Sequence, residues 1–363
     1  MENTRLAKIM KAMKENHVEQ MIISDPASIY YLTGCWIHPG ERLMTLFLNI
    51  DGKVQMILNK LFPQGNKFSF DIEYYDDVDD CVAVLAKYVK DGKTFGVDKV
   101  WPAKFLLRLM ELRPGCRFVN SSVIVDHIRQ IKDEKEQELM RVSSQVNDMV
   151  MEKLYRHVAD GLTEQGVADI LLDEYEKAGC EGVSFDPIVG YGANAADPHH
   201  ATDKVTLGKR GDAVVLDIGG VKDGYCSDMT RTVFLGEASE KAREVYHVVL
   251  EANLRGIAAA KPGNRFCDVD NACRDYITEK GYGQYFTHRT GHNIGIEDHE
   301  FGDVSSVNEE VIKPGMVFSV EPGIYIPGEV GVRIEDLVLI TKDGCEVLNR
   351  FTKDLLVVCS SSA

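Results

Sequence analysis

The sequence lacks the patterns that would place a chain in a membrane. No apolar run approaches the roughly 20 residues that a helix needs to span a bilayer. The opening stretch, MENTRLAKIMKAMKEN, also lacks the apolar core of a signal peptide. We therefore expect a protein with no membrane partner that stays in the cytoplasm.

Cysteine pairs are missing too. The nine cysteines are scattered singly, and none of them forms a CxxC pair. An odd number of isolated cysteines fits reduced thiols better than a disulfide framework or a zinc ribbon. We expect most of these side chains to serve only in packing.

Positive charge is scarce as well. The chain has 41 Lys and Arg against 57 Asp and Glu, which gives a formal net charge of -16 at pH 7. Nucleic acid and anionic membranes bind clustered Lys and Arg, so the sequence predicts no nucleic-acid partner. The acidic balance is compatible with a site that binds cations.

What is present indicates a globular chain of two domains. Hydrophobic residues make up 44% of the 363 residues and charged residues 27%, as in ordinary soluble proteins. A single core is uncommon at this length, so two domains are favoured. We place the boundary near residue 125, with domains at 1–125 and 126–363.

The first domain reads as alternating helices and strands of α/β type. Helical spacing recurs at Leu6, Ile9, Met10 and Met13. The short runs QMIIS, MTLFLNI, VQMIL and KTFGVD read as strands, with a hairpin turn in NIDGKV. No group of catalytic side chains lies here, so this part is predicted to be a scaffold or dimerisation domain.

A long helix is expected to open the second domain. It starts at Asp133 and places Leu139, Val142, Val146 and Met149 on one face. Later helices are expected over 240–260 and 267–280, among strands at AVVLDIGG, YCSDMTRTVFL, GMVFSVEPG and GVRIEDLVLIT. The second domain is therefore predicted to be α+β.

Four carboxylates interrupt these strands. Asp217 follows AVVL, and a hairpin around VKDG would make Asp228 its cross-strand or diagonal neighbour on the same face. Glu321 ends the apolar strand MVFSV, and Glu335 interrupts GVRIEDLVLI. A buried carboxylate costs several kcal/mol unless it is paired, hydrogen-bonded or bound to a metal. Two carboxylates held close together share either a proton or a cation.

One histidine joins this group, since His292 lies between glycines in HRTGHNIG. Four carboxylates and one imidazole suit a pair of divalent ions such as Mn, Co or Zn. Each residue alone also has a structural interpretation: Asp217 as a strand-edge feature, His292 as a hydrogen-bonding group, Glu335 as a partner of Arg333. The five residues taken together favour the metal site.

The motifs DIGG, SDMTRT, HRTGH, EPGIY and VRIED, in that order, resemble the metallopeptidase family with the pita-bread fold. That family includes methionine aminopeptidase, aminopeptidase P and prolidase. The resemblance covers the whole second domain and implies a pita-bread catalytic domain. It also implies two bound metals, with Mn as the first choice, bridged by Asp228 and Glu335. The implied ligands are Asp217, Asp228, His292, Glu321 and Glu335.

The resemblance assigns catalytic roles as well. His199 and His299 match family histidines that contact substrate near the scissile bond, and Glu321 doubles as a proton shuttle. Two such ions activate a water, and a positioned imidazole stabilises the charge that develops on the carbonyl oxygen. Arg333 is expected to orient the carboxylates from behind. His200 matches no functional position of the family, and we expect an exposed loop residue.

The choice of peptidase depends on the first domain and on Arg289. Methionine aminopeptidases generally lack such a domain, whereas aminopeptidase P and prolidase have one of creatinase type. Arg289 stands in HRTGH where many members have Gly, and it matches the prolidase pattern. A dipeptide ends one residue beyond the scissile bond, and an Arg can clamp that carboxylate. The alternative for Arg289 is a salt bridge to an acidic neighbour. For His288, both substrate binding and support of the His292 loop remain open.

The stretch WIHPGERL resembles the loop with which bacterial prolidases cover the partner's site across a homodimer. By this resemblance, His38 and Arg42 bind substrate. The loop departs from the pattern because Gly40 replaces a bulkier residue, and Trp36 and Ile37 stand where an acidic residue often precedes the His.

The sequence therefore predicts a Xaa-Pro dipeptidase (prolidase) with two metals, acting on a small peptide as a cytoplasmic homodimer. The alternative is an aminopeptidase P that acts on longer peptides. The same fold also hosts metal-free creatinase-like hydrolases and non-catalytic binding proteins, but these typically lose ligands that this chain keeps. The preference for proline rests on resemblance alone.

Overall fold

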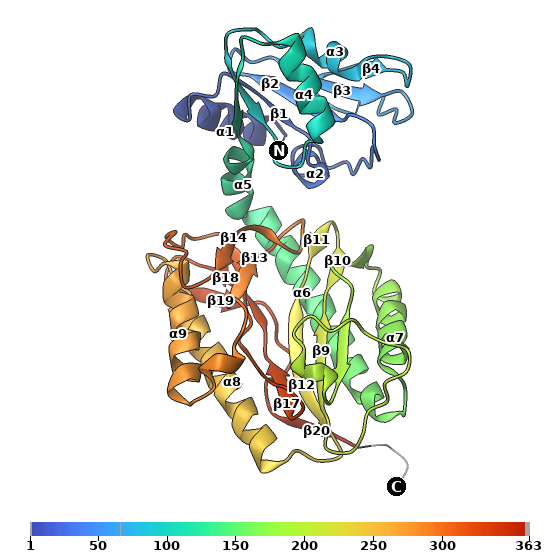
Figure 1. The fold of residues 1–363 in the computed structure, drawn as a ribbon, viewed down its shortest axis with the longest axis vertical. Coiled ribbons are helices and arrows are strands. Elements are labelled where there is room, and N and C mark those ends of the chain that lie inside the picture. The colour runs from blue at the N-terminus through green and yellow to red at the C-terminus, as the bar shows by residue number, and fades with distance from the viewer. Residues whose placement is uncertain (1, 66, 360–363) are drawn as a thin grey trace. The chain divides into compact units, whose positions relative to one another are not determined.

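The computed structural model describes residues 2–65 and 67–359, and the chain forms two compact units, Met1–Arg129 and Gln130–Ala363 (Figure 1). Residue 125, where the sequence analysis places the domain boundary, falls inside helix α5 (Ser122–Gln130). All nine cysteines are free thiols. Among the helices of the described ranges, none is long and apolar enough to cross a bilayer.

The first unit contains a mixed six-stranded sheet with the strand order β4-β3-β2-β1-β5-β6. The predicted hairpin joins β2 to β3, with Gly52 at a φ of 96°, which glycine adopts without strain. The two edge strands, β4 and β6, escape prediction because DIEYY and RFVN are half-solvated and carry little apolar alternation. The strands are β1 (Gln20–Ile23), β2 (Thr45–Asn49), β3 (Val54–Asn59), β4 (Asp71–Tyr75), β5 (Thr94–Val97) and β6 (Arg117–Asn120).

Helices connect these strands. They are α1 (Glu2–Glu15), α2 (Pro26–Thr33), α3 (Cys81–Ala86), α4 (Ala103–Leu112) and α5. The apolar core of this unit joins sheet residues such as Phe47 and Phe95 to helix residues such as Leu85 and Leu109. The unit therefore has its own core and the α/β character that the sequence predicts.

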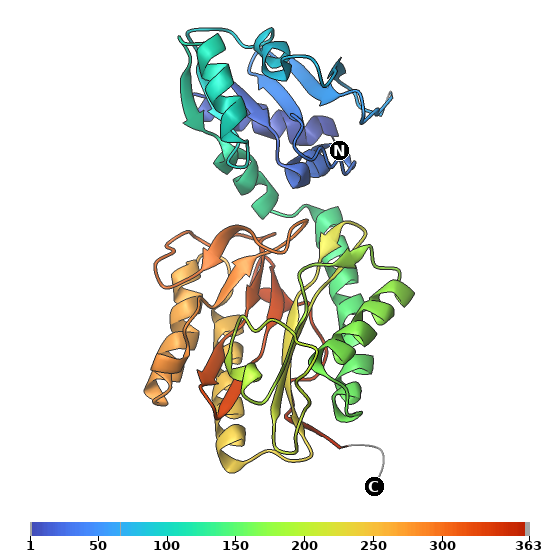
Figure 2. The same cartoon turned by 45° about the vertical axis from the view of Figure 1, so that its right-hand side comes forward.

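In the second unit, long helices cover the strands from two sides. Figures 1 and 2 show α6 and α7 along one side of the sheets and α8 and α9 along the other. Two buried cores correspond to these two sides, one including α6 and α7 and the other α8 and α9. The helices are α6 (Glu134–Leu154), α7 (Glu164–Lys177), α8 (Glu240–Ala259) and α9 (Phe266–Glu279).

The strands of the second unit pair in sheets ordered β11-β10-β7, β20-β12-β9-β8, β14-β13-β15-β18-β19 and β16-β17. Their bounds are β7 (Gly182–Val183), β8 (Ile188–Tyr191), β9 (Ala213–Ile218), β10 (Gly220–Lys222), β11 (Tyr225–Cys226), β12 (Met229–Leu235), β13 (Gly291–Asn293), β14 (Glu300–Val304), β15 (Val317–Val320), β16 (Gly323–Ile326), β17 (Val330–Arg333), β18 (Asp336–Ile340), β19 (Cys345–Val347) and β20 (Leu356–Val358).

Helix α6 begins as predicted after its cap, Asp133, but the face that it buries matches the predicted one only in part, at Val146. Met149, predicted to face the core, is 56% exposed, so this part of the prediction is wrong. The buried residues of α6 include several polar ones, and two of these, Ser143 and Asn147, donate to main-chain oxygens of β10 and β9. Apolar spacing cannot locate a face whose task is to hydrogen-bond the strands.

Strands β9 and β12 are antiparallel neighbours, and Thr230 pairs with Asp217. Asp228, two residues earlier than Thr230, is therefore the diagonal neighbour of Asp217 on the same face, as predicted. The connection turns back at Asp223 and Gly224, with φ of 51° and 77°. Two successive positive φ values are the mark of a type I′ turn, which suits an Asp-Gly pair.

Candidate metal centre

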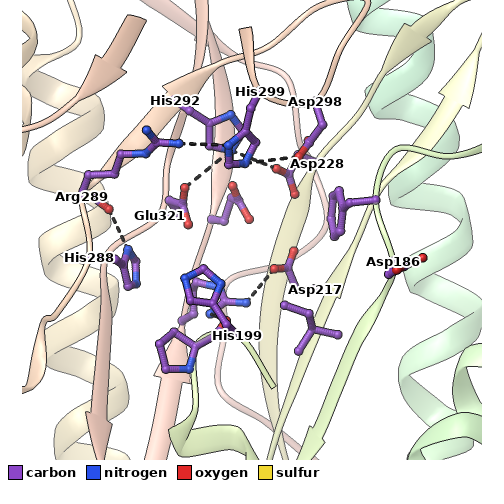
Figure 3. Close-up of a pocket in the computed structure, with 15 residues that line it drawn as sticks. Asp186, His199, Asp217, Asp228, His288, Arg289, His292, Asp298, His299 and Glu321 are labelled. Carbon is purple, nitrogen blue, oxygen red and sulfur yellow. Dashed lines mark hydrogen bonds and ion pairs between the residues drawn. The ribbon is translucent and has the colours of Figure 1, made fainter. Parts of the chain in front are cut away.

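The five side chains predicted to bind metal meet around one cavity of the second unit (Figure 3). Asp217 lies in β9 and His292 in β13, whereas the other three stand at strand ends: Asp228 before β12, Glu321 after β15 and Glu335 before β18. The cavity has a volume of about 400 Å³. Residues from distant parts of the sequence thus converge because their strands are neighbours in the sheets.

The strand backbone places His292 and Glu321 next to each other. A Cβ on Gly291 would collide with the main-chain oxygen of Ser319, so β13 approaches β15 closely at this point. The amide of His292 donates to Ser319 Oγ (3.0 Å), and that hydroxyl donates to Glu321 Oε1 (3.3 Å). The pairing of β13 with β14 shifts by a bulge between His292 and Asn293, a feature that often redirects a side chain beside a site.

His292 lies among the carboxylates with one nitrogen directed at them. Its Nε2 is 3.4 Å from Asp228 Oδ2 and 3.6 Å from Glu321 Oε1. Its Nδ1 is 3.2 Å from the main-chain oxygen of Asn293 and therefore carries the proton. Burial and the neighbouring His299 lower the pKa of His292 to about 3. The ring is neutral with Nε2 free, which is the form that binds metals.

Several carboxylate oxygens in the cavity have no partner. One buried oxygen on each of four carboxylates accepts no hydrogen bond from the described part of the chain: Asp217, Asp228, Asp298 and Glu335. Asp228 is 4% exposed and Glu335 1% exposed. Burial, followed by neighbouring carboxylates, raises the pKa of both well above the ordinary range. Such oxygens are costly unless a cation neutralises them, so this set of oxygens and one imidazole nitrogen fits divalent ions.

Arg333 fixes the carboxylates from one side. Its Nη2 lies 2.6 Å from Asp217 Oδ2, and its Nε donates to Thr230 Oγ1 at 3.0 Å. The Thr230 hydroxyl in turn donates to Glu335 Oε2 at 2.8 Å. One guanidinium therefore positions two carboxylates, one directly and one through Thr230, while leaving their second oxygens open.

His288 lines the cavity, but both of its nitrogens are engaged. Nδ1 is 2.7 Å from the main-chain oxygen of Arg289, and Nε2 is 2.8 Å from the hydroxyl of Tyr325. Tyr325 also accepts from Arg333. Burial lowers the pKa of His288 to about 4, so the ring is neutral. Of the two roles left open by the sequence, this geometry favours the structural one, because only the ring face remains for a substrate.

Arg289 and His299 lie side by side at the cavity. Arg289 Nη2 is 3.0 Å from His299 Nδ1, and the His299 ring stacks on His292 with centroids 3.8 Å apart. No acidic side chain within the described ranges lies within ion-pair distance of Arg289. The salt bridge considered as an alternative for Arg289 is therefore not found, and the guanidinium faces the cavity.

Sequence reasoning missed Asp298, which immediately precedes His299. Its side chain is 17% exposed, and Oδ2 lies 3.3 Å from His299 Nε2. Burial, then the charge of Asp217, raises the pKa of Asp298 to about 7. The only signal in the sequence is the run of three acidic residues around the histidine in IEDHE. Phe185 and Ile188, which also line the cavity, carry no chemical signature in the sequence.

The loop that carries His199 is tied down by its neighbour. His199 lines the cavity, whereas His200 turns away and places Nε2 2.6 Å from Glu164 Oε2. The His200 side chain is 13% exposed. The expectation of an exposed loop histidine is therefore wrong, because a buried carboxylate binds the ring.

The loop of the first unit that the sequence assigns to substrate binding has partners within that unit. Arg42 makes a bidentate ion pair with Asp77, at 2.8 and 2.9 Å. The His38 ring stacks on Trp36, with centroids 5.8 Å apart. A substrate contact of His38 and Arg42 in a partner subunit stays a prediction.

Comparison with known proteins gives matches along nearly the whole chain. Residues 138–342 match metallopeptidase family M24, and residues 5–131 match the creatinase/prolidase N-terminal domain. An uncharacterized peptidase of Staphylococcus aureus is 35% identical over 357 residues, which cover 96% of this chain and 100% of the relative.

Solved structures are similar over the same length. A prolidase from Thermococcus sibiricus has a TM-score of 0.94 and 30% identity, with 99% of each chain covered. An X-Pro aminopeptidase from Thermotoga maritima has a TM-score of 0.83 and 30% identity, with 96% of this chain and 100% of the other covered. Both domains therefore have full-length structural counterparts.

Proposed function

The chain belongs to metallopeptidase family M24, and we propose that within this family it is a Xaa-Pro dipeptidase that hydrolyses dipeptides with a C-terminal proline. The predicted fold, a creatinase-type N-terminal domain before a pita-bread catalytic domain, is confirmed. The protein is thus a metallopeptidase. Its substrate length, its metal and its oligomeric state belong to the proposal.

The observation that carries the proposal is the unpaired guanidinium of Arg289. A prolidase and an X-Pro aminopeptidase are both about 30% identical to this chain, so overall similarity does not choose between them. A dipeptide presents a carboxylate one residue beyond the scissile bond, whereas a longer peptide presents a neutral amide there. Arg289 donates one N–H to His299 Nδ1, and the remaining N–H groups of its planar guanidinium can hold a carboxylate.

The metal centre follows from the oxygens that lack partners. Two divalent ions would be held by Asp217, Asp228, His292, Glu321 and Glu335, with Asp228 and Glu335 between the ions. Carboxylate-rich donors favour Mn, with Co or Zn as alternatives. When bound, such ions supply a nucleophilic water at neutral pH and polarise the scissile carbonyl. The unpartnered oxygens disfavour a metal-free hydrolase or a binding protein, because a metal-free cavity would leave them unneutralised.

Side chains of this chain would carry out proton transfer and position the substrate. Glu321, at the edge of the proposed metal centre, would hold a proton and pass it to the leaving proline nitrogen, the role that the family resemblance implies for it. Arg289 donates to His299 Nδ1, so the proton of neutral His299 is on Nε2, which lies 3.3 Å from Asp298 Oδ2, and the His299 ring would contact the substrate near the scissile bond. His199 lies across the cavity from this group and would contact the substrate near the scissile bond (Figure 3).

The proposal includes a cytoplasmic homodimer. In it, the loop with His38 and Arg42 would cover the partner's cavity. The Tyr30, Trp36 and His38 rings stack in sequence, with centroids 4.7 and 5.8 Å apart, and this would hold the loop ready. Sedimentation of the full-length chain measures the oligomeric state directly.

The test compares Ala-Pro with Ala-Pro-Ala on the Mn-loaded protein. The wild type should cleave Ala-Pro, and Arg289→Met should lower kcat/KM for Ala-Pro by roughly 100-fold or more, since truncating one partner of a charge pair is costly. Arg289→Lys keeps the positive charge but loses the planar pair of donors, so its kcat/KM for Ala-Pro should lie between those of the wild type and Arg289→Met.

Cleavage of the tripeptide should change little in Arg289→Met, because its second residue carries no carboxylate. A wild type that cleaves only the tripeptide would identify an aminopeptidase P instead. Equal losses on both peptides would show that Arg289 clamps no carboxylate.

A further inference from the structure

Asp298 is a cavity carboxylate that the proposed ligand set does not use. It lies between β13 and β14, and its side chain is 17% exposed. Figure 3 shows its carboxyl beside that of Asp228. Asp298 also offers a ligand atom within 4.8 Å of ligand atoms on His292 and His299. The chain therefore places a carboxylate against the metal centre in addition to the four carboxylates of the proposed ligand set.

The two oxygens of Asp298 differ. Oδ2 is 3.3 Å from His299 Nε2, whereas Oδ1 is buried and accepts no hydrogen bond from any described residue. The next acidic residue, Glu300, shows what a structural carboxylate looks like here. It pairs with Lys132 at 2.9 Å and accepts the amide of Ile296 at 2.9 Å. Asp298 has no such cationic partner among the described residues, and its charge adds to that of Asp228.

A second observation points to a ligand at the same place. Asp228 is 4% exposed, and its Oδ1 is also buried without a partner. Two neighbouring carboxylates that each hold an unpartnered oxygen repel one another unless they share a proton or a cation lies close to both. The imidazole of His292, with its free Nε2 3.4 Å from Asp228, supplies the nitrogen donor for that cation.

We propose that Asp298, through Oδ1, is an additional ligand for the divalent ion bound by Asp228 and His292, while Oδ2 stays with His299. The inference rests on the metal centre proposed above and extends its ligand set. An added carboxylate oxygen raises the coordination number of that ion. It thereby favours an ion that accepts six ligands, such as Mn, over Zn, which prefers four.

The test uses the full-length chain, freed of metal with a chelator and then titrated with Mn(II). Asp298→Asn keeps the shape and removes the charged oxygen, so the weaker Mn(II) binding step should lose about tenfold or more in affinity. Asp186→Asn is the matched control. Asp186 lines the same cavity but is exposed, so its loss should change Mn(II) affinity by no more than about threefold.

The absorption spectrum of bound Co(II) separates ligation from a general effect of charge. If Asp298 is a ligand, Asp298→Asn changes the visible Co(II) bands, whereas Asp186→Asn leaves them as in the wild type. A fall in affinity with unchanged bands, or equal falls in both variants, would overturn the proposal. The melting temperature of the metal-free Asp298→Asn chain checks folding, and it should not fall because a repulsive charge has been removed.

Failure of this inference and failure of the metal centre give different results. A wild type that binds neither Mn(II) nor Co(II) contradicts the centre itself. A wild type that binds both, with Asp298→Asn equal to it in affinity and spectrum, contradicts only the role of Asp298. If Asp298→Asn does not fold, Asp298→Ser removes the same oxygen with a smaller side chain and is judged by the same two measurements.

Discussion

Two clusters in the second unit contain the same kinds of side chain and differ in how their oxygens are satisfied. The anchor cluster is Glu164, His200 and Asp203, and the cavity cluster includes Asp228, His292 and Glu335. Both bring carboxylates and an imidazole within reach of one ion. By residue type and proximity alone, both would be taken for metal sites.

Hydrogen bonding separates the two clusters. Glu164 is completely buried, but its oxygens receive the amides of Tyr191 and Asp203, the side-chain amide of Asn194 and the ring of His200. Asp228 and Glu335, equally buried, each keep an oxygen that nothing in the described ranges satisfies. Unmet hydrogen-bonding capacity in buried carboxylates is therefore the reason that we propose the cavity cluster, and not the anchor cluster, as the metal site.

The anchor cluster has a structural task. Glu164 opens helix α7 and holds the loop after β8 by bonding both His200 and the amide of Asp203. His199, adjacent to His200, is the residue of that loop that lines the cavity. The anchor cluster thus positions His199 at the cavity that contains the cavity cluster.

The largest expected effect comes from a change in the cavity cluster. Asp228→Asn should lower kcat/KM by about 1000-fold or more, because the substitution removes the charge of a carboxylate that we propose as a ligand of both ions. The metal-free Asp228→Asn chain should melt no lower than the metal-free wild type, because the substitution removes one of several crowded buried acidic groups. Steady-state kinetics measure kcat/KM, and a thermal melt measures the stability of the metal-free chain. Activity near that of the wild type would mean that the cavity cluster is structural.

Metal addition gives the next effect. Mn(II) at about 100 times its dissociation constant should raise the free energy of unfolding by about 2.7 kcal/mol, and a chelator should reverse the gain. Urea unfolding with and without Mn(II) measures it. The comparison predicts that Glu164→Gln keeps this increment and that Asp228→Asn loses most of it. An increment that disappears in Glu164→Gln would place metal in the anchor cluster instead.

A change in the anchor cluster should cost stability rather than metal. Glu164→Gln directs an amide group at donors, so at least one buried donor loses its acceptor, and the free energy of unfolding should fall by about 1–3 kcal/mol. Urea unfolding of the metal-free chain measures the loss, with Asp228→Asn as the matched control. If Glu164→Gln were as stable as the wild type, the hydrogen bonds of the anchor cluster would not have the structural role assigned to them.

The smallest expected effect is a change in the stability of the metal-free protein with pH. Burial raises the pKa of Glu321 from 4.5 to about 8, so the folded chain binds more protons than the unfolded chain between these values. Stability from this group is complete below pH 4.5 and is lost as pH rises through 8, by at most about 1.4 kcal/mol per pH unit. Melts from pH 5 to 9 should show the decline, and Glu321→Gln should reduce it. A profile identical in Glu321→Gln would exclude Glu321 as its cause.

Much of the site was accessible from the sequence because its residues break a strong local rule. A carboxylate such as Asp217 inside an apolar strand, and the Asp-Gly turn that pairs β9 with β12, are visible without a structure. The buried face of α6 was not, because Asn147 is buried by bonding the backbone of β9 and not by being apolar. His200 and Asp298 were not accessible either, since their meaning depends on partners that are far apart in the chain.

The turn at Asp223 and Gly224 sets a limit on how the gene for this protein can change. Surface turns usually tolerate gained or lost codons. Here an inserted residue that the turn did not absorb as a longer loop or a bulge would shift the pairing of β12 against β9 by one and send Asp228 to the opposite face of the sheet from Asp217. The length of this hairpin should therefore drift far less among descendants of this sequence than its exposed position suggests.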